Sequence, residues 1–199
     1  MPRMVTGNQR VGRPRDSRID HVVLQAVRQL VNDVGYDGFT IDDVAAHAAA
    51  SRAAIYRRFG SKAELVFAAS VHGLDATPPP DTGTLKGDLL AMARFIRDNM
   101  GRTEARQAAP ALVAELARDP DLVIRFRQTF VAKEQADFAA LVDRALARGE
   151  LTRPIDPAVL HLLLSGPIFA ALVAFHTPVD EHLLNGLIEI IADGLLCAT

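Results

Sequence analysis

Hydroxyl and guanidinium groups are concentrated in one short stretch of the chain, residues 51–59, with the sequence Ser-Arg-Ala-Ala-Ile-Tyr-Arg-Arg-Phe. In a helix, Ile55 and Phe59 would share one face, because they are four residues apart. Arg52 and Tyr56 would lie on other faces. Arginine can donate two hydrogen bonds to guanine, and hydroxyl groups suit phosphate oxygens. The pattern predicts a helix that is anchored by its apolar side and contacts DNA with its polar side.

The residues just before this stretch predict a second short helix. Thr40 and Asp43 have the spacing of a capping box, which would open a helix over residues 41–48. Three small or apolar residues could hold this helix against the next one: Val44, Ala45 and Ile55. Two short helices joined by a tight turn over residues 41–59 predict a helix-turn-helix, whose second helix (52–59) enters the major groove.

Helical signals continue along the rest of the chain, and strand-like alternation is absent over any useful length. The sequence therefore predicts an all-α fold: an N-terminal three-helix helix-turn-helix domain followed by a C-terminal helical ligand-binding and dimerisation domain, with about nine helices in total. The expected helices span residues 18–34, 41–48, 52–59, 62–74, 85–101, 103–118, 120–148, 157–176 and 180–196.

Three consecutive prolines at 78–80 predict a stiff, non-helical linker. We expect a flexible basic arm over 1–16, a DNA-binding domain over 17–75, and a ligand-binding and dimerisation domain over 84–199. Charge supports this division. Residues 1–62 carry 10 Lys and Arg against 6 Asp and Glu, whereas the remainder carries 12 against 18. A basic first third on an acidic remainder is typical of a DNA-binding head on a body that avoids DNA.

The segment from Phe39 to Leu65 contains Phe-Thr-Ile, Val-Ala and Ser-Arg-Ala-Ala-Ile-Tyr-Arg-Arg-Phe-Gly-Ser-Lys-Ala-Glu-Leu. It resembles the head of the tetracycline-repressor (TetR) family of transcriptional regulators, over about residues 17–70. The most specific part is Tyr56-x-x-Phe59 followed by Lys62. The resemblance implies phosphate contacts from Thr40, Tyr56 and Lys62, and base or phosphate contacts from Ser51, Arg52, Arg57 and Arg58.

The turn between the two short helices departs from the family pattern, because Ala49 stands where the family usually has glycine. If the position requires a positive φ, alanine costs roughly 1 kcal/mol there. The departure favours an alternative function, a helical dimer that binds small molecules without operator-specific DNA binding. Retention of Arg52, Tyr56, Arg57 and Lys62 favours a DNA-binding regulator.

The segment 157–175 has no charged residue over 19 positions, which approaches the length of a membrane span. His161, Ser165 and Gly166-Pro167 interrupt it, so a buried helix is expected and no membrane partner. His161 and His176 are expected to be hydrogen-bonded interface residues. Together with the amphipathic helix 180–196, helix 157–176 predicts a homodimer whose two heads bind a palindromic operator on double-stranded DNA.

The family resemblance also implies a pocket for a small hydrophobic ligand among the helices that span 85–148. The apolar candidates for its lining are Met92, Phe95, Ile96, Met100, Phe126, Phe130 and Phe138. For each of them an ordinary core position is the favoured interpretation over pocket lining. We expect ligand binding to release DNA by favouring a different spacing of the two heads.

No catalytic signature accompanies these features. The chain lacks a nucleophile elbow, a phosphate-binding loop, a dinucleotide fingerprint and the His or Cys spacings of metal sites. We therefore expect neither an enzyme nor a bound cofactor or metal. The single cysteine, Cys197, and an N-terminus without an apolar core are consistent with a cytoplasmic protein. The sequence predicts a ligand-responsive transcriptional regulator, with repression as the default.

The N-terminal arm carries Arg10, Arg13 and Arg15 around a Gly-Arg-Pro tripeptide. Two interpretations are open: insertion of arginine into a narrow minor groove, or unspecific attraction by a disordered tail.

Deleting residues 1–15 is expected to weaken operator binding and to flatten its salt dependence, because fewer counterions are released when fewer cations contact phosphates. Operator affinity measured at several salt concentrations checks this. If the shortened protein binds the operator with the affinity of the full-length protein at every salt concentration, a role for the arm is excluded.

Overall fold

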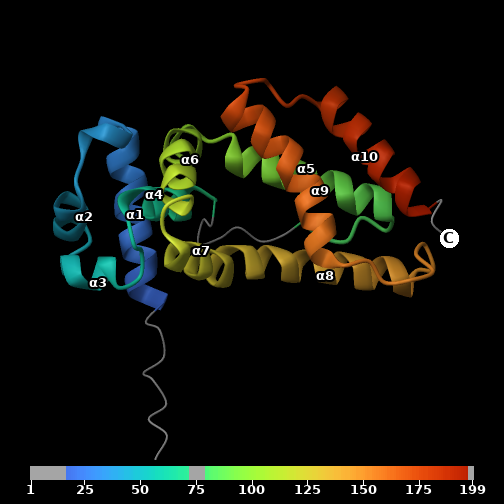
Figure 1. The fold of residues 1–199 in the computed structure, drawn as a ribbon, viewed down its shortest axis with the longest axis horizontal. Helices are drawn as coiled ribbons and strands as arrows, with labels where there is room; N and C mark the ends of the chain where they lie inside the picture. Colours follow the sequence, from blue (N-terminus) through green and yellow to red (C-terminus); the bar gives the residue numbers. More distant parts are fainter. Residues whose placement is uncertain (1–16, 72–78, 197–199) are drawn as a thin grey trace, which may run out of the picture.

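The computed structural model describes residues 17–71 and 79–196, and within these two ranges every regular element is a helix. The all-helical fold expected from the sequence is confirmed. Figure 1 shows an elongated molecule with the first helices gathered at one end and the later helices forming the rest of its length. The expected basic arm, with Arg13 and Arg15, lies outside the described residues.

The head contains three α-helices that precede the shared helix α4. Its elements are α1 (Ser17–Val34), the 3₁₀ turn η1 (Tyr36–Gly38), α2 (Ile41–His47), α3 (Arg52–Tyr56) and α4 (Lys62–Val71). The expected helix 52–59 ends earlier, at Tyr56. The chain continues as a turn in which the Phe59 amide still donates to the Ile55 carbonyl over 2.9 Å, so Phe59 keeps its inward position.

Side-chain caps open the helices where the sequence predicted them. The Thr40 hydroxyl accepts from the Asp43 amide, and the Asp43 carboxylate accepts from the Thr40 amide, which completes the predicted capping box. Ser51 caps α3 by accepting from the Ala54 amide over 3.1 Å. In the body, aspartates cap three further helices in the same way: Asp119, Asp156 and Asp180.

Helix α2 ends in a left-handed residue, and that residue is Ala49, with φ of 47°. The Ala49 amide donates to the Ala46 carbonyl and the Ala50 amide to the Ala45 carbonyl, which is the Schellman arrangement. Helix α8 ends in the same arrangement with Gly149 in the left-handed position. The turn of the helix-turn-helix thus keeps the geometry that favours glycine and places a methyl group in it.

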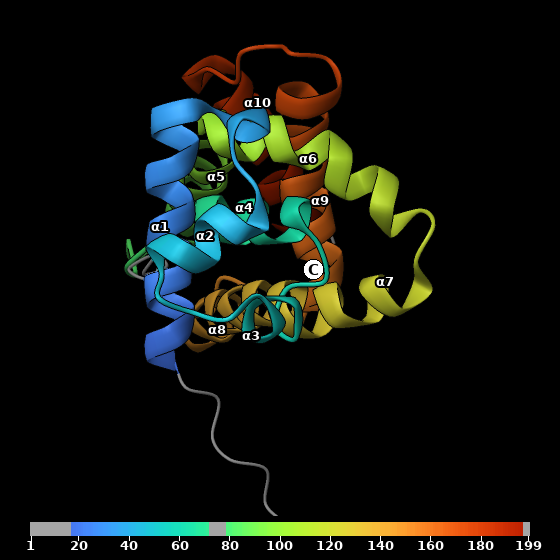
Figure 2. The same cartoon turned by 90° about the vertical axis from the view of Figure 1, so that its left-hand side faces the viewer.

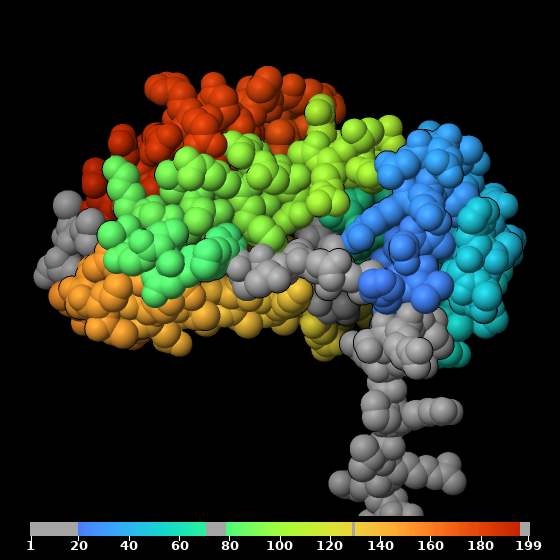
Figure 3. Space-filling model, turned by 180° about the vertical axis from the view of Figure 1, so that it is seen from behind, coloured from blue at the N-terminus to red at the C-terminus, as the bar shows by residue number. Residues whose placement is uncertain are grey.

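Helix α4 connects the head to the body. Residues 63–70 of this helix are all buried, and Ala63, Leu65 and Val66 have no exposed surface. It packs against α1 on one side and against α6 (Thr103–Leu116) on the other. The space-filling view shows the blue surface of α1 lying beside the yellow-green surface of α6 (Figure 3). Buried residues of head and body therefore form one continuous core.

The body is built around α5. In addition to α6, the body contains the following elements: α5 (Leu85–Met100), α7 (Pro120–Phe126), the π turn η2 (Arg127–Val131), α8 (Ala132–Ala147), α9 (Pro157–Phe169), the π turn η3 (Ala170–Ala174) and α10 (Glu181–Leu196). The described residues contain ten α-helices, one more than expected, because η2 divides the predicted helix 120–148 into α7 and α8. Pro110 lies inside α6.

A buried carboxylate ties the start of α5 to the end of α8. Asp88 accepts from the Thr82 amide over 2.7 Å and from Arg148 Nη2 over 3.1 Å, and Arg144 Nε lies 3.5 Å away. Burial alone would raise the pKa of Asp88, but the hydrogen bonds from Thr82 and Arg148 outweigh it and lower the pKa. Leu89 and Met92 continue the same buried face of α5.

The apolar segment Pro157–Ala174 is long and apolar enough to cross a membrane, a match of length and composition only. It was expected to be buried, in part against a second chain, and within the single chain one side of it is covered. Leu160, Leu164 and Ile168 are fully buried against the neighbouring helices α5 and α8. The opposite face of α9, which carries Val159 and Leu163, is exposed.

Replacing Ala49 by glycine is expected to stabilise the fold by about 0.5–1 kcal/mol, because glycine adopts a positive φ without steric cost. Ala49 is exposed, so no packing is lost. Ala46→Gly, at an exposed position inside α2, is the matched control and should destabilise by about 1 kcal/mol. Thermal unfolding monitored by circular dichroism distinguishes the two. A lower melting temperature for both variants would contradict the interpretation of the turn.

Candidate DNA interface and ligand cavity

The end of the molecule that carries α2 and α3 presents a polar surface. Figure 2 views the molecule from this end, with both helices facing the reader. Arg52 is exposed, donates to Asp42 over 3.0 Å, and lies 5.4 Å from the centre of the Tyr56 ring. Arg57 is also exposed and forms no ion pair within the part of the chain that the structure describes. Ile55 is buried on the opposite side of α3.

The hydroxyl groups of this surface already serve as helix caps. Ser51 accepts a hydrogen bond in its cap and keeps its own hydrogen for another acceptor. The Thr40 hydroxyl donates to the Asp43 carboxylate over 2.7 Å. That bond lowers the pKa of Asp43, and a phosphate contact from Thr40 would have to replace it.

Lys62, at the start of α4, is directed toward the segment that precedes α2. Its ammonium group donates to the Phe39 carbonyl and lies 4.2 Å from the centre of the Phe39 ring and 4.8 Å from that of Tyr36. Partial burial lowers the pKa of Lys62. The cation therefore holds the 36–39 segment against α4.

Arg58 points away from the exposed face of α3. Its side chain is only 18% exposed, forms an ion pair with Asp20 on α1, and donates to the Ala54 carbonyl over 3.3 Å. Unlike Arg52 and Arg57, it fixes the end of α3 to α1 and is not available at the surface.

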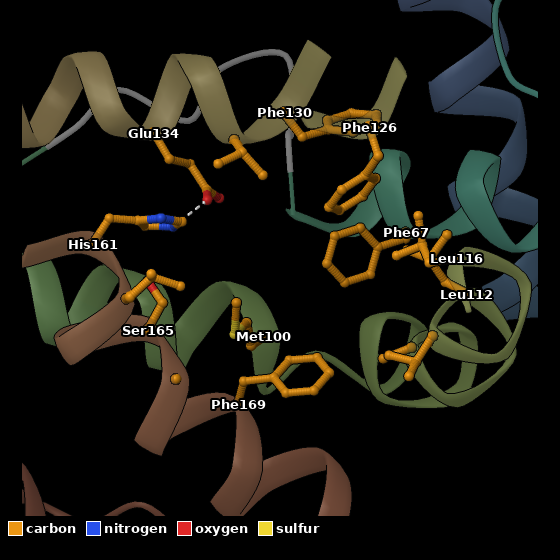
Figure 4. A pocket seen from close by; sticks show the side chains of 15 residues that line it. Phe67, Met100, Leu112, Leu116, Phe126, Phe130, Glu134, His161, Ser165 and Phe169 are labelled. Carbon is orange, nitrogen blue, oxygen red and sulfur yellow. Dashed lines mark hydrogen bonds and ion pairs between the residues drawn. The ribbon is translucent and has the colours of Figure 1, made fainter. Parts of the chain in front are cut away.

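A cavity of about 260 Å³ lies among the helices of the body, with one wall residue, Phe67, contributed by α4. Its walls come from α4, α5, α6, α7, η2, α8 and α9, and most are apolar (Figure 4). The lining residues are Phe67, Met100, Ala109, Leu112, Val113, Leu116, Phe126, Phe130, Val131, Glu134, His161, Leu162, Ser165, Gly166 and Phe169.

Polar groups occupy one end of this cavity. His161 Nε2 and Glu134 Oε2 are 2.8 Å apart, and Ser165 lies beside them on the next turn of α9 (Figure 4). At the other end, the rings of Phe67 and Phe126 are 5.8 Å apart. The cavity thus joins a polar end made by α8 and α9 to an aromatic end made by α4 and α7.

Two family models match the chain. Residues 23–69 match the model described as bacterial regulatory proteins, tetR family, and residues 79–191 match the tetracyclin repressor-like C-terminal domain. The chain belongs to the TetR family. It is a TetR-family transcriptional regulator, as the sequence predicted.

Relatives of this TetR-family chain match it over most of its length. The DNA-binding transcriptional repressor TetR of Mycobacteroides abscessus is 34% identical over 184 residues, covering 87% of this chain and 91% of that protein. An uncharacterised HTH-type transcriptional regulator of Mycobacterium tuberculosis is 32% identical over 177 residues, covering 88% and 85%. The crystal structure of a TetR family transcription regulator, 27% identical, matches with a TM-score of 0.74, covering 90% of this chain and 98% of that one.

The residues predicted to line the TetR-family pocket divide into two groups in the structure. Phe126, Phe130 and Met100 line the cavity. Four candidates do not: Met92, Ile96 and Phe138 are buried in the core, and Phe95 packs at its edge. Of the predicted pocket residues on α5, only Met100, at the C-terminal end of the helix, lines the cavity.

Sequence reasoning missed the cavity residues that come from other parts of the chain. Phe67 was assigned to the head, and His161 was expected at an interface, whereas the structure pairs it with Glu134 in the cavity. His176 is exposed beyond η3 with a positive φ of 51°. The sequence did contain a signal for this polar end of the cavity. His161 and Ser165 are four residues apart on an otherwise apolar helix, so they lie on the same face.

Proposed function

We propose that this regulator forms a homodimer and binds an inverted-repeat operator through the α3 helix of each chain. We further propose that a small apolar ligand in the cavity causes the regulator to release the operator. The α3 surface carries the proposal. Arg52 and Tyr56 are exposed on this short helix, and exposed Arg57 directly follows it. Buried Ile55 and the adjoining Arg58 fix the helix to the rest of the head.

The composition of α3 favours contact with the major groove. Exposed Arg57 is suited to a bidentate contact with guanine, and Arg52 can exchange Asp42 for a base or a phosphate. Ala53 and Ala54 are small, so the helix backbone can approach the bases closely. Ser51, Tyr56, Thr40 and Lys62 surround the helix with groups that suit phosphate oxygens.

The uncovered face of α9 supports dimerisation. Four apolar residues at helical spacing are exposed along it: Val159, Leu163, Gly166 and Pro167. On α10, Gly186 has open space where a side chain would be, and Ile190 is 75% exposed. Such a surface is unfavourable in water and would be covered by the same surface of a second chain. Two heads would then contact two half-sites of a palindrome.

The position of α4 supports coupling between the ligand and DNA. Phe67 lines the cavity, and two residues later the Ala69 carbonyl accepts from Arg28 Nε on α1 over 2.6 Å. A ligand that displaces Phe67 would shift α4 and therefore α1. A ligand that binds more tightly to one spacing of the two heads than to the other is sufficient to release DNA. The regulator would act in the cytoplasm, where the bacterial chromosome lies.

Arg57→Ala is expected to weaken operator binding by about 5- to 150-fold, the range for loss of one bidentate base contact. Fluorescence anisotropy with labelled DNA from upstream of the protein's own gene measures the affinity. Arg106→Ala removes an exposed arginine from α6 and should leave the affinity unchanged. Equal losses in the two variants would argue against a specific contact from α3.

Leu163→Glu is expected to produce a monomer, because it places a carboxylate in the proposed interface. Leu163 is 47% exposed, so the fold should tolerate the change. Ile124→Glu on α7, where Ile124 is 53% exposed, is the matched control and should leave the dimer intact. Light scattering coupled to size-exclusion chromatography gives the mass of each. A dimeric Leu163→Glu variant would contradict an interface at α9.

A further inference from the structure

One arginine of the α3 surface is held from two sides. Arg52 Nη1 lies 3.0 Å from Asp42 Oδ2 and 3.3 Å from Asp42 Oδ1, and the guanidinium carbon lies 5.4 Å from the centre of the Tyr56 ring. The side chains of Arg52 and Asp42 are 60% and 65% exposed. Because an exposed ion pair adds little to the stability of a fold, the main effect of these contacts is on where the guanidinium group points.

The cap of α2 does not account for Asp42. The next residue, Asp43, completes the capping box with Thr40. Within the described ranges, the Asp42 side chain accepts hydrogen bonds from Arg52 alone. A carboxylate on a surface that meets phosphates opposes the binding of every DNA sequence alike. Its presence beside Arg52 therefore favours a role in choosing between sequences over a role in total affinity.

The Asp42 carboxylate engages only part of the guanidinium group. Both of its hydrogen bonds come from Nη1, so the edge formed by Nε and Nη2 is not used by Asp42. Arginine presents its five N–H donors in a rigid planar fork, and a two-donor edge matches O6 and N7 of guanine. Arg52 can therefore contact a guanine without giving up Asp42.

The charge of Asp42 favours guanine over phosphate as the partner of Arg52. A phosphate held by the same guanidinium group would lie close to the carboxylate, and the two anions would repel each other. O6 and N7 of guanine are neutral acceptors and avoid this repulsion. Displacement of water from the groove would also strengthen the attraction between Arg52 and Asp42, because the local dielectric constant falls.

We propose that Asp42 is a positioning residue that holds Arg52 for a bidentate contact with one guanine in each half-site of the operator. The proposal rests on the proposed function, since it requires α3 in the major groove. Tyr56 restricts the guanidinium group from a second side. The base preference at one position of the half-site then depends on two residues from different helices, Asp42 on α2 and Arg52 on α3.

Selection of binding sites from a library of random duplex DNA tests this proposal. The full-length protein and its Arg52→Ala and Asp42→Asn variants are each used for selection, and the bound DNA is sequenced. The unaltered protein is expected to select guanine at one position of each half-site. Arg52→Ala should lose that preference. Asp42→Asn should weaken the preference at the same position and leave the other positions unchanged.

Affinities for the selected site and for an unrelated duplex separate positioning from charge. Asp42→Asn should bind the selected site about two- to tenfold more weakly, the effect of releasing one immobilised side chain. It should bind the unrelated duplex more tightly, because a negative charge is removed, which also shows that the fold is intact. Asp33→Asn, at an exposed position near the end of α1, is the matched control. It should leave the base preference unchanged and shift both affinities in the same direction.

Three results would overturn the role of Asp42. The first is an Asp42→Asn variant that changes its affinity for both duplexes by the same factor. The second is a preference lost at different positions in Asp42→Asn and Arg52→Ala, which would indicate a direct base contact from Asp42. The third is an Arg52→Ala variant that keeps its preference for guanine at every position. If the unaltered protein selects no common sequence, operator binding in the proposed function fails as well.

Discussion

The packing of α4 on two sides is the constraint on which the rest of the structure depends. Because Ala63, Leu65 and Val66 are fully buried, α4 cannot move without disturbing either α1 or α6. Close-packed interiors transmit displacement instead of absorbing it. The linker at 79–84 separates head from body along the chain, but no gap separates them in the core. In the proposed function, a ligand that displaces Phe67 would act on the DNA surface through this single element.

Local features of this fold were predictable from the sequence because they depend on neighbouring residues. The capping box of Thr40 and Asp43 was located correctly. The sequence also identified Ala49 as the position where a positive φ would be costly, and the structure has a positive φ there. The orientation of Arg58 was not predicted, because it depends on Asp20 in another helix. Nothing in residues 51–59 distinguishes an arginine that faces DNA from one that faces α1.

The cavity was only half predictable for the same physical reason. Helical periodicity indicates which face of a helix is apolar but not whether that face meets core or empty space, so Met92 and Phe126 looked alike. The structure places Met92 in the core and Phe126 on the cavity wall. The charged end depends on α8 and α9 lying side by side, which brings Glu134 and His161 together across 27 positions of sequence. No local sequence pattern indicates that these two side chains lie close together in space.

The π turn η2 has a consequence for how this fold tolerates changes in length. A π turn holds one residue more than the α turn that it replaces. Deleting one residue within Arg127–Val131 would restore α geometry and leave α7 and α8 facing as they do now. The same deletion within α8 would rotate the remainder of that helix by about 100°, carrying Arg148 away from Asp88. η2 is therefore the place where this chain could lose one residue and keep the relative orientation of α7 and α8.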